Sequence, residues 1–258
     1  MAVVTYPVES EEFGEVSLRV EVYGEGAPFL LLHGGAGPVS MSRFAELLAQ
    51  RQPAQVFAPT HPGFALTDRP ETLRDIGGLA RLYAALLEQV APTGVTVVGN
   101  SIGGWIAVEL GLLQAAPISR LVLIDAVGLD VPGHPVTDVA GMAVPEIMQL
   151  SFHDPAPFLR DPATLSDDER AALAANQAAL TVYAPQMTDP TLGERLPELT
   201  VPTLVLWGDS DGIADTDYGR AYADTIDGAQ FELLADTGHM PQMESPDRVI
   251  AALEDTRR

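Results

Sequence analysis

The sequence predicts an α/β protein in which a mostly parallel sheet is flanked by helices. Five short apolar runs end in Gly, Asp or Asn, as strands buried on both faces of a parallel sheet often do. Helical stretches lie between these runs, and strand alternating with helix implies crossover connections with helices on both faces of the sheet. The runs begin at Phe29, Val95, Leu121, Thr203 and Phe231.

The elements follow one another in a regular order. Residues 16–22 alternate apolar and polar side chains, which predicts a half-exposed strand near a sheet edge, antiparallel to its neighbour. Ser245-Pro246 marks the start of the last helix, with an N-cap followed by proline in the first turn. The helices expected around the sheet span 41–51, 72–90, 103–115, 217–226 and 246–255.

Residues 127–199 interrupt this alternation. They contain no strand-like run, and prolines separate helical pieces over roughly 137–152 and 167–183. The second piece begins Ser166-Asp-Asp-Glu169, a capping-box pattern. We expect a lid over the carboxyl ends of the strands, where parallel sheets bind ligands; a helical layer with its own small core is the alternative. The expected domains are an α/β core, 1–126 and 200–258, and a helical cap, 127–199.

The length and composition are typical of a folded globular protein. The chain has 258 residues, of which 47% are hydrophobic and 19% charged, and a chain of this size buries a full core without disulfides or metals. It has no cysteine, which excludes a disulfide scaffold, a thiolate metal site and a cysteine nucleophile. All 14 basic residues are arginine, so a lysine Schiff base and a P-loop lysine are excluded as well.

The charge and the apolar segments indicate which partners to expect. A formal net charge of −22 repels a phosphate backbone, so we expect no nucleic-acid partner. The N-terminus lacks the basic region and apolar stretch of a secretory signal. The longest strongly apolar runs have the length of strands, far below the roughly 20 residues of a membrane span. We therefore expect a cytoplasmic protein that does not bind a membrane.

Gly99-Asn100-Ser101-Ile102-Gly103 matches the nucleophile-elbow pattern Gly-x-Ser-x-Gly. The motif lies between an expected strand and an expected helix, which is the setting that the pattern requires. The glycines allow a strained turn that exposes the Ser101 hydroxyl above the sheet, at the N-terminus of a helix whose dipole favours a developing negative charge. We predict Ser101 as the nucleophile; a glycine-rich junction with an idle serine is the alternative.

A serine nucleophile needs a base, and the base needs an acid that orients it. His239 follows the last strand, so it completes the chain order of nucleophile, acid and base. Asp211 is the preferred acid because it lies far enough into its loop to reach across the strand ends. Asp209 is expected to hold the turn, and Asp125 is the rival acid. The remaining histidines are expected in a turn, in a loop or at the surface: His33, His61, His134 and His153.

The oxyanion of a tetrahedral intermediate needs backbone donors. The first is the amide of Ile102, the residue after the nucleophile. The second is expected from the glycine-rich loop 33–37, where the backbone can approach a substrate closely; Gly35 is our choice and Ala36 the alternative. A phosphate-binding loop is disfavoured, because no lysine follows and the glycine spacing fits no nucleotide motif.

Taken together, these motifs resemble the α/β-hydrolase family. The resemblance rests on His33-Gly34-Gly35, the elbow around Ser101, Trp207-Gly-Asp-Ser-Asp211 and Thr237-Gly-His239, in family order over nearly the whole chain. It implies an eight-stranded, mostly parallel sheet with a helical lid after the sixth strand. It also implies a catalytic triad of Ser101, Asp211 and His239, since the family usually places its acid where Asp211 stands.

The expected function is hydrolysis of a small-to-medium ester or lactone, without cofactor or metal, through an acyl-enzyme on Ser101. The glycine-rich loop and the elbow also resemble the subgroup that cleaves carbon–carbon bonds in ring-opened aromatic acids, which usually has tryptophan where Met240 stands here. A ligand sensor on the same fold is a further alternative. The expected substrate-binding residues are Met142, Met148, Phe152 and Met240. The sequence indicates no oligomeric state.

Overall fold

The computed structural model describes residues 1–91, 94–115, 117–139 and 141–255. Residues 256–258, the end of the expected core range, lie outside the described residues. The strands span Ala2–Ser10 (β1), Gly14–Tyr23 (β2), Ala27–Leu32 (β3), Ala54–Pro59 (β4), Val95–Asn100 (β5), Ile118–Ile124 (β6), Thr203–Gly208 (β7) and Gln230–Leu234 (β8). The α-helices span Val39–Arg51 (α1), Ile76–Val90 (α2), Ile102–Leu112 (α3), Val144–Ser151 (α4), Asp167–Tyr183 (α5), Leu192–Arg195 (α6), Thr216–Thr225 (α7), Pro241–Glu244 (α8) and Pro246–Asp255 (α9). Short 3-10 helices span Phe64–Leu66 (η1), Pro162–Thr164 (η2) and Leu196–Glu198 (η3).

The eight strands form one sheet in the order β1-β2-β4-β3-β5-β6-β7-β8. β2 pairs antiparallel with β1 and with β4, whereas all other pairings are parallel. The mostly parallel eight-stranded sheet is therefore confirmed. Two strands that the sequence analysis did not expect, β1 and β4, flank β2, so that the half-exposed strand lies second from the sheet edge.

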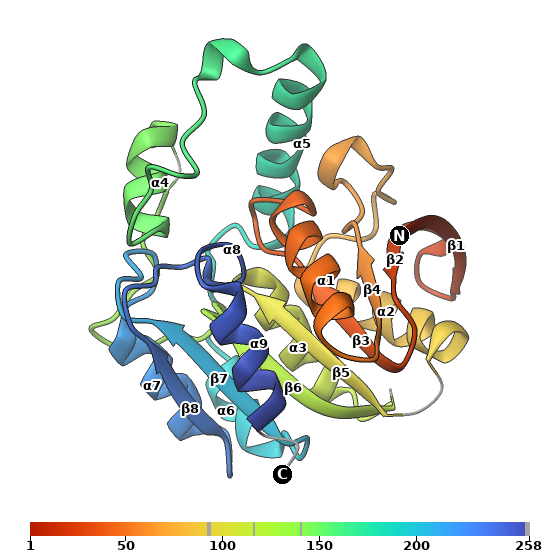
Figure 1. Cartoon of the computed structure of the whole chain (residues 1–258). Coiled ribbons are helices and arrows are strands. Elements are labelled where there is room, and N and C mark those ends of the chain that lie inside the picture. The colour runs from red at the N-terminus through yellow and green to blue at the C-terminus, as the bar shows by residue number, and fades with distance from the viewer. Residues whose placement is uncertain (92–93, 116, 140, 256–258) are drawn as a thin grey trace.

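Helices cover both faces of the sheet (Figure 1). Successive side chains of a strand point to opposite faces, and β3 shows the result: Phe29 and Leu31 pack in one core with α1 and α9. Leu30 and Leu32 pack in a second core with α2, α3 and α7. Because both faces are covered, the central strands are mostly apolar, which is the pattern that predicted them.

Three expected helices are shorter than their sequence patterns, and the one expected over 103–115 ends at Leu112. The stretch 72–90 becomes helical only at Ile76, because the Asp75 side chain accepts a hydrogen bond from the Gly78 amide (2.6 Å) and caps the helix there. Among the described residues of the stretch 137–152, which leave out residue 140, only α4 is helical, and its second residue is Pro145. Proline is favoured in the first turn of a helix and disfavoured within it.

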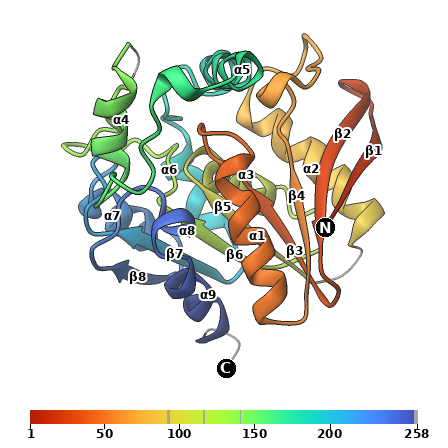
Figure 2. The ribbon, with the colours of Figure 1, turned by 45° about the horizontal axis from the view of Figure 1, so that its top comes forward.

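The chain between β6 and β7 carries α4, α5 and α6, and we call residues 127–199 the insert. Figures 1 and 2 show α4 on the side of β8 and α7, and α5 on the side of α1 and α2. The amide of Gly212, after β7, donates to Leu150 O at 2.9 Å, while Asn176 on α5 donates to Ala36 O, after β3, at 3.2 Å. The insert therefore contacts loops that follow the carboxyl ends of two parallel strands. In the described ranges, no helix is long and apolar enough to cross a membrane.

Candidate active site

Ser101 lies in the sharp turn between β5 and α3. Its φ and ψ are 56° and −122°, a conformation that is strained for a residue with a side chain. Its amide donates to Ile124 O at 3.0 Å, and its own carbonyl oxygen accepts from the Gly104 amide at 2.9 Å. These bonds hold the strained turn between β6 and the first turn of α3.

Close contacts explain the glycines that flank this turn. A Cβ on Gly99 would lie 2.1 Å from the carbonyl oxygen of Gly103. A Cβ on Gly103 would lie 2.1 Å from the carbonyl oxygen of Leu32. Glycine at both positions therefore allows α3 to begin directly against the ends of β5 and β3, which is the physical content of the Gly-x-Ser-x-Gly pattern.

His239 and Asp211 meet, although 28 residues separate them in the chain. His239 Nδ1 lies 2.8 Å from Asp211 Oδ2. The other carboxylate oxygen, Oδ1, accepts from the amides of Ile213 (2.7 Å) and Ala214 (3.1 Å). Both side chains are buried. The contact fixes the imidazole tautomer with its proton on Nδ1, which leaves Nε2 as the basic nitrogen.

Two buried amide side chains attach the His239 loop to the turn that carries Ser101. Asn100 Nδ2 donates to the carbonyl oxygens of Ile124 (3.2 Å) and His239 (2.9 Å). Gln242 Nε2 in turn donates to Asn100 Oδ1 at 3.1 Å. The residue before Ser101 thus holds the main chain of His239 beside the elbow. The sequence analysis gave these amides no role, and the available signals were a polar residue ending a buried strand and a glutamine in an apolar loop.

The loop that follows β3 passes directly beside Ser101. A Cβ on Gly34 would lie 3.0 Å from Ser101 Cβ. A Cβ on Gly35 would lie 2.8 Å from Leu180 Cδ2 on α5. Gly34, which precedes Gly35, therefore lies beside Ser101, which precedes Ile102. That the amides of Gly35 and Ile102 face one oxyanion stays a prediction.

Two buried histidines, His33 and His61, hydrogen-bond to each other and to the main chain of this loop. His33 Nε2 accepts from the His61 amide at 3.1 Å, and His33 Nδ1 donates to Gly34 O at 2.8 Å. His61 Nε2 donates to His33 O at 2.9 Å, and its Nδ1 accepts from the Tyr83 hydroxyl at 2.5 Å. Burial lowers the pKa of His61 to about 4, and burial followed by the neighbouring His61 lowers the pKa of His33 well below its ordinary value. Both imidazoles are neutral at pH 7 and hold the loop in place.

Three other polar residues considered in the sequence analysis take no part in the contact between His239 and Asp211. The side chains of His134 and His153 are 35% and 44% exposed, in the insert. Asp209 Oδ1 accepts from the Ser210 hydroxyl (2.8 Å) and from the Thr237 amide (3.4 Å). Asp209 thus holds the turn after β7, as expected.

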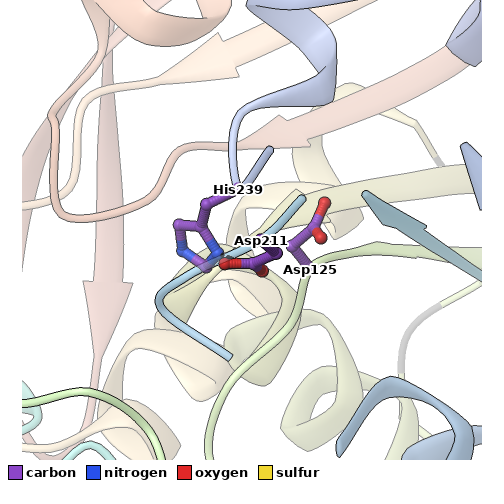
Figure 3. A group of neighbouring side chains, drawn as sticks. All are labelled: Asp125, Asp211 and His239. Atoms are coloured by element: carbon purple, nitrogen blue, oxygen red, sulfur yellow. Dashed lines mark hydrogen bonds and ion pairs between the residues drawn. The ribbon is translucent and has the colours of Figure 1, made fainter. Parts of the chain in front are cut away.

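Asp125, the rival acid, lies beside the pair (Figure 3). Asp125, Asp211 and His239 each offer one oxygen or nitrogen within 4.8 Å of the others. The hydrogen bond of His239 Nδ1 goes to Asp211, whereas Asp125 Oδ1 accepts from the Gly208 amide at 2.9 Å. Burial, followed by the Asp211 charge, raises the pKa of Asp125 well above its ordinary value. The trio has the donor types of a divalent-metal site, but the histidine nitrogen that faces the acids is already hydrogen-bonded to Asp211.

The four predicted substrate-binding residues lie in two places. Phe152 and Met240 are buried at the His239 loop, where a Cβ on Gly238 would lie 2.7 Å from Phe152 Cα. Met142 lies in the turn before α4 and Met148 on α4, both partly buried. Their contact with a substrate stays a prediction.

A cavity of about 400 Å³ lies elsewhere in the molecule, between α2, α3 and the segment 183–190. Its walls include Asp75, Trp105, Tyr183 and Arg195 and none of the predicted site residues. Arg195 is paired there with Glu109 and Asp189, each at 2.7 Å. This cavity is distinct from the group around Ser101 and His239.

Comparison with known proteins identifies the family. A model described as "Alpha/beta hydrolase family" matches residues 29–252, which is most of the chain. The chain belongs to the alpha/beta hydrolase family. Among solved structures, a thermophilic esterase from Thermogutta terrifontis superposes on this alpha/beta hydrolase with a TM-score of 0.78 and 25% identity, covering 100% of this chain and 98% of that one.

Relatives of this alpha/beta hydrolase include two hydrolases that are named for different reactions. Lipase 3 of Moraxella sp. (strain TA144) is 26% identical over 236 residues, covering 85% of this chain and 74% of the lipase. The 2-hydroxymuconate semialdehyde hydrolase of Pseudomonas putida is 26% identical over 281 residues, covering 96% of this chain and 95% of that enzyme. Both of these relatives are hydrolases, so hydrolase activity is supported.

Proposed function

We propose that this protein hydrolyses small-to-medium carboxylic esters or lactones through an acyl-enzyme on Ser101. The observation that carries the proposal is the buried 2.8 Å contact between His239 Nδ1 and Asp211 Oδ2. Asn100 holds the main chain of His239 next to the strained turn that bears Ser101. A hydroxyl, an imidazole and a carboxylate in this order are the parts of a serine-hydrolase triad.

The proposed reaction has two half-reactions. His239 Nε2 takes the Ser101 hydroxyl proton while the oxygen attacks the ester carbonyl, and Asp211 stabilises the imidazolium that forms. The amides of Ile102 and Gly35 donate to the oxyanion. The tetrahedral intermediate collapses as His239 returns the proton to the leaving alkoxide. Water, deprotonated by His239, then attacks the acyl-enzyme and releases the acid.

We further propose that residues 127–199 are the lid of this site and that the rest of the chain is its catalytic core. Asn176 links α5 to the oxyanion loop through Ala36 O, while its Oδ1 accepts from the Ala65 amide at 2.8 Å. On the other side of the site, Gly212, next to the acid Asp211, bonds Leu150 at the end of α4. A substrate enclosed by the lid would contact Met142, Met148, Phe152 and Met240.

The nucleophile is tested with Ser101→Ala and a p-nitrophenyl ester. We expect kcat to fall at least about 10³-fold, because a triad member acts with its partners as a unit. A fluorophosphonate should label the wild-type protein and leave the variant unlabelled. Ser119→Ala is the matched control, since its hydroxyl donates to Gly94 O away from the site, and it should keep wild-type turnover. Undiminished hydrolysis by Ser101→Ala would refute the assignment.

Carbon–carbon hydrolysis of ring-opened aromatic acids is the second candidate. The alignment with the 2-hydroxymuconate semialdehyde hydrolase covers nearly the whole of both chains, whereas the alignment with the lipase covers a smaller share of each. Incubation with a ring-opened dienoate and with a panel of esters and lactones decides between the two reactions. Faster turnover of the dienoate than of every ester would favour the second candidate. Labelling of Ser101 without turnover of any of these compounds would instead favour a ligand sensor.

A further inference from the structure

A fourth side chain belongs with the proposed triad. Asp125 follows β6 directly, with φ of 44°, a left-handed conformation that aspartate tolerates better than most residues. Its amide donates to Leu206 O on β7 at 3.0 Å. The side chain is fully buried and lies with Asp211 and His239 in one group (Figure 3).

The hydrogen bonds around the two carboxyl groups are unequal. Asp211 receives three donors: the imidazole of His239 and the amides of Ile213 and Ala214. Asp125 receives one, from the Gly208 amide to Oδ1. Its Oδ2 is buried and accepts from no donor in the described part of the chain. A buried carboxylate oxygen without a donor is costly, whereas a protonated one is itself a donor.

We propose that Asp125 is a positioning residue that carries a proton at pH 7 and donates a hydrogen bond to the Asp211 carboxylate. The inference rests on the triad of the proposed function and extends it by one residue. Two carboxylates so close in a buried site do not both ionise easily. The negative charge belongs on Asp211, which has three donors and faces the imidazole, so the proton belongs on Asp125.

The surroundings of Asp125 favour the same distribution. The titratable groups placed with it by the structure are Asp211, from the loop after β7, and His239, from the loop after β8. Burial is the largest cause that raises the pKa of Asp125, and the Asp211 charge raises it further. The Gly208 amide lowers it, with a smaller effect than burial and the Asp211 charge.

Such a bond would act on catalysis through Asp211. A donor to the carboxylate fixes its rotation, and with it the direction of the Oδ2 that holds His239. It also spreads the negative charge of Asp211, which tempers the basicity that this charge confers on the imidazole. A second ionised carboxylate at the same place would have the opposite effect, because it would repel Asp211 and increase the negative charge near His239.

The proposal is tested with Asp125→Asn and Asp125→Ala. Asparagine keeps a donor for Asp211 and an acceptor for the Gly208 amide, so kcat at pH 7 should stay within about threefold of wild type. Alanine removes both bonds, and kcat should fall about 10- to 100-fold, as expected when a catalytic group is displaced by about 1 Å. Asp224 is an exposed acid on α7. Asp224→Asn is therefore the control for an Asp-to-Asn change away from the site and should leave kcat unchanged.

A direct readout of the proton separates positioning from a merely structural role. Infrared spectra at pH 7 should show the carbonyl stretch of a protonated carboxyl group in wild type and in Asp224→Asn, but not in Asp125→Asn. Absence of this band from wild type, or equal losses of kcat in Asp125→Asn and Asp125→Ala, would overturn the proposal. Ser101→Ala should abolish turnover and keep the band. Turnover retained by Ser101→Ala would therefore refute the proposed function, whatever the infrared result.

The stability of Asp125→Asn gives a further outcome with a definite sign. A buried acid with a raised pKa must take up a proton on folding above the unfolded pKa, so it costs stability as pH rises from about 4. Asparagine needs no proton, so the melting temperature of Asp125→Asn relative to wild type should rise between pH 4 and pH 8. A difference that stays constant or falls over this range would show that Asp125 is ionised in the folded protein and would overturn the proposal.

Discussion

The close packing of Gly208 against the His239 loop makes a sharp prediction for Gly208→Ala. A Cβ at this position would lie 2.2 Å from Gly238 O and 2.3 Å from Thr237 O, both main-chain atoms. Close carbon–oxygen contacts in proteins are about 3.3 Å or longer. The loop or the end of β7 must therefore shift by about 1 Å to accept one methyl group.

This shift acts directly on the proposed base, because His239 is the next residue after Gly238. A displacement of about 1 Å in a catalytic group costs about 100-fold in rate, and overpacking a close-packed site costs about 1–3 kcal/mol. We expect Gly208→Ala to lower kcat for an activated ester about 100-fold. We expect its free energy of unfolding to fall by about 1–3 kcal/mol, with KM changed much less than kcat.

Steady-state ester hydrolysis and urea unfolding measure the two quantities on the same preparation. Gly193→Ala is the matched control: it lies in α6, where a Cβ would meet only Leu129 Cδ1 at an ordinary 3.4 Å. It should keep wild-type kcat and lose no stability, since alanine favours helix over glycine. If folded Gly208→Ala retained wild-type kcat, the loop would accept the methyl group without displacing His239. The argument from close contact would then be refuted.

Three further predictions concern groups around the site. Asn100→Leu removes the donor to His239 O, so the His239 loop loses its hydrogen bond to the elbow. Steady-state kinetics, which give kcat and KM separately, should show kcat lowered at least about 10-fold. Asn176→Leu leaves Ala36 O and the Ala65 amide without their partner on α5, so urea unfolding should show a loss of about 1–3 kcal/mol. The buried His61, whose pKa falls from 6.5 to about 4 on folding, binds a proton more readily when unfolded. The free energy of unfolding should therefore fall as pH drops from 6.5 to about 4, and should fall less in His61→Gln.

Local sequence patterns predicted most of the fold because burial on two faces leaves a visible trace. The central strands are continuous apolar runs, and the helices between them carry caps and apolar periodicity. The two strands that escaped notice show that trace weakly. β1 is mostly exposed at the sheet edge, and β4, although buried, is a short stretch, Ala-Gln-Val-Phe-Ala-Pro, that contains a glutamine and ends in proline. Such strands are defined by their hydrogen-bonding neighbours more than by their own residues.

The sequence by itself determined the elbow at Ser101 and the position of His239 at the last strand's end, because a strained turn needs specific glycines in a specific order. It left Asp211 and Asp125 as rivals, since both follow neighbouring parallel strands. The tertiary structure decided that His239 bonds Asp211, three residues beyond β7, while Asp125 stays at the end of β6 with the Gly208 amide. Asn100 and Gln242 acquired their roles only there. Which polar atoms meet depends on differences of about 1 Å in the relative position of loops that are far apart in sequence. No local pattern encodes those positions.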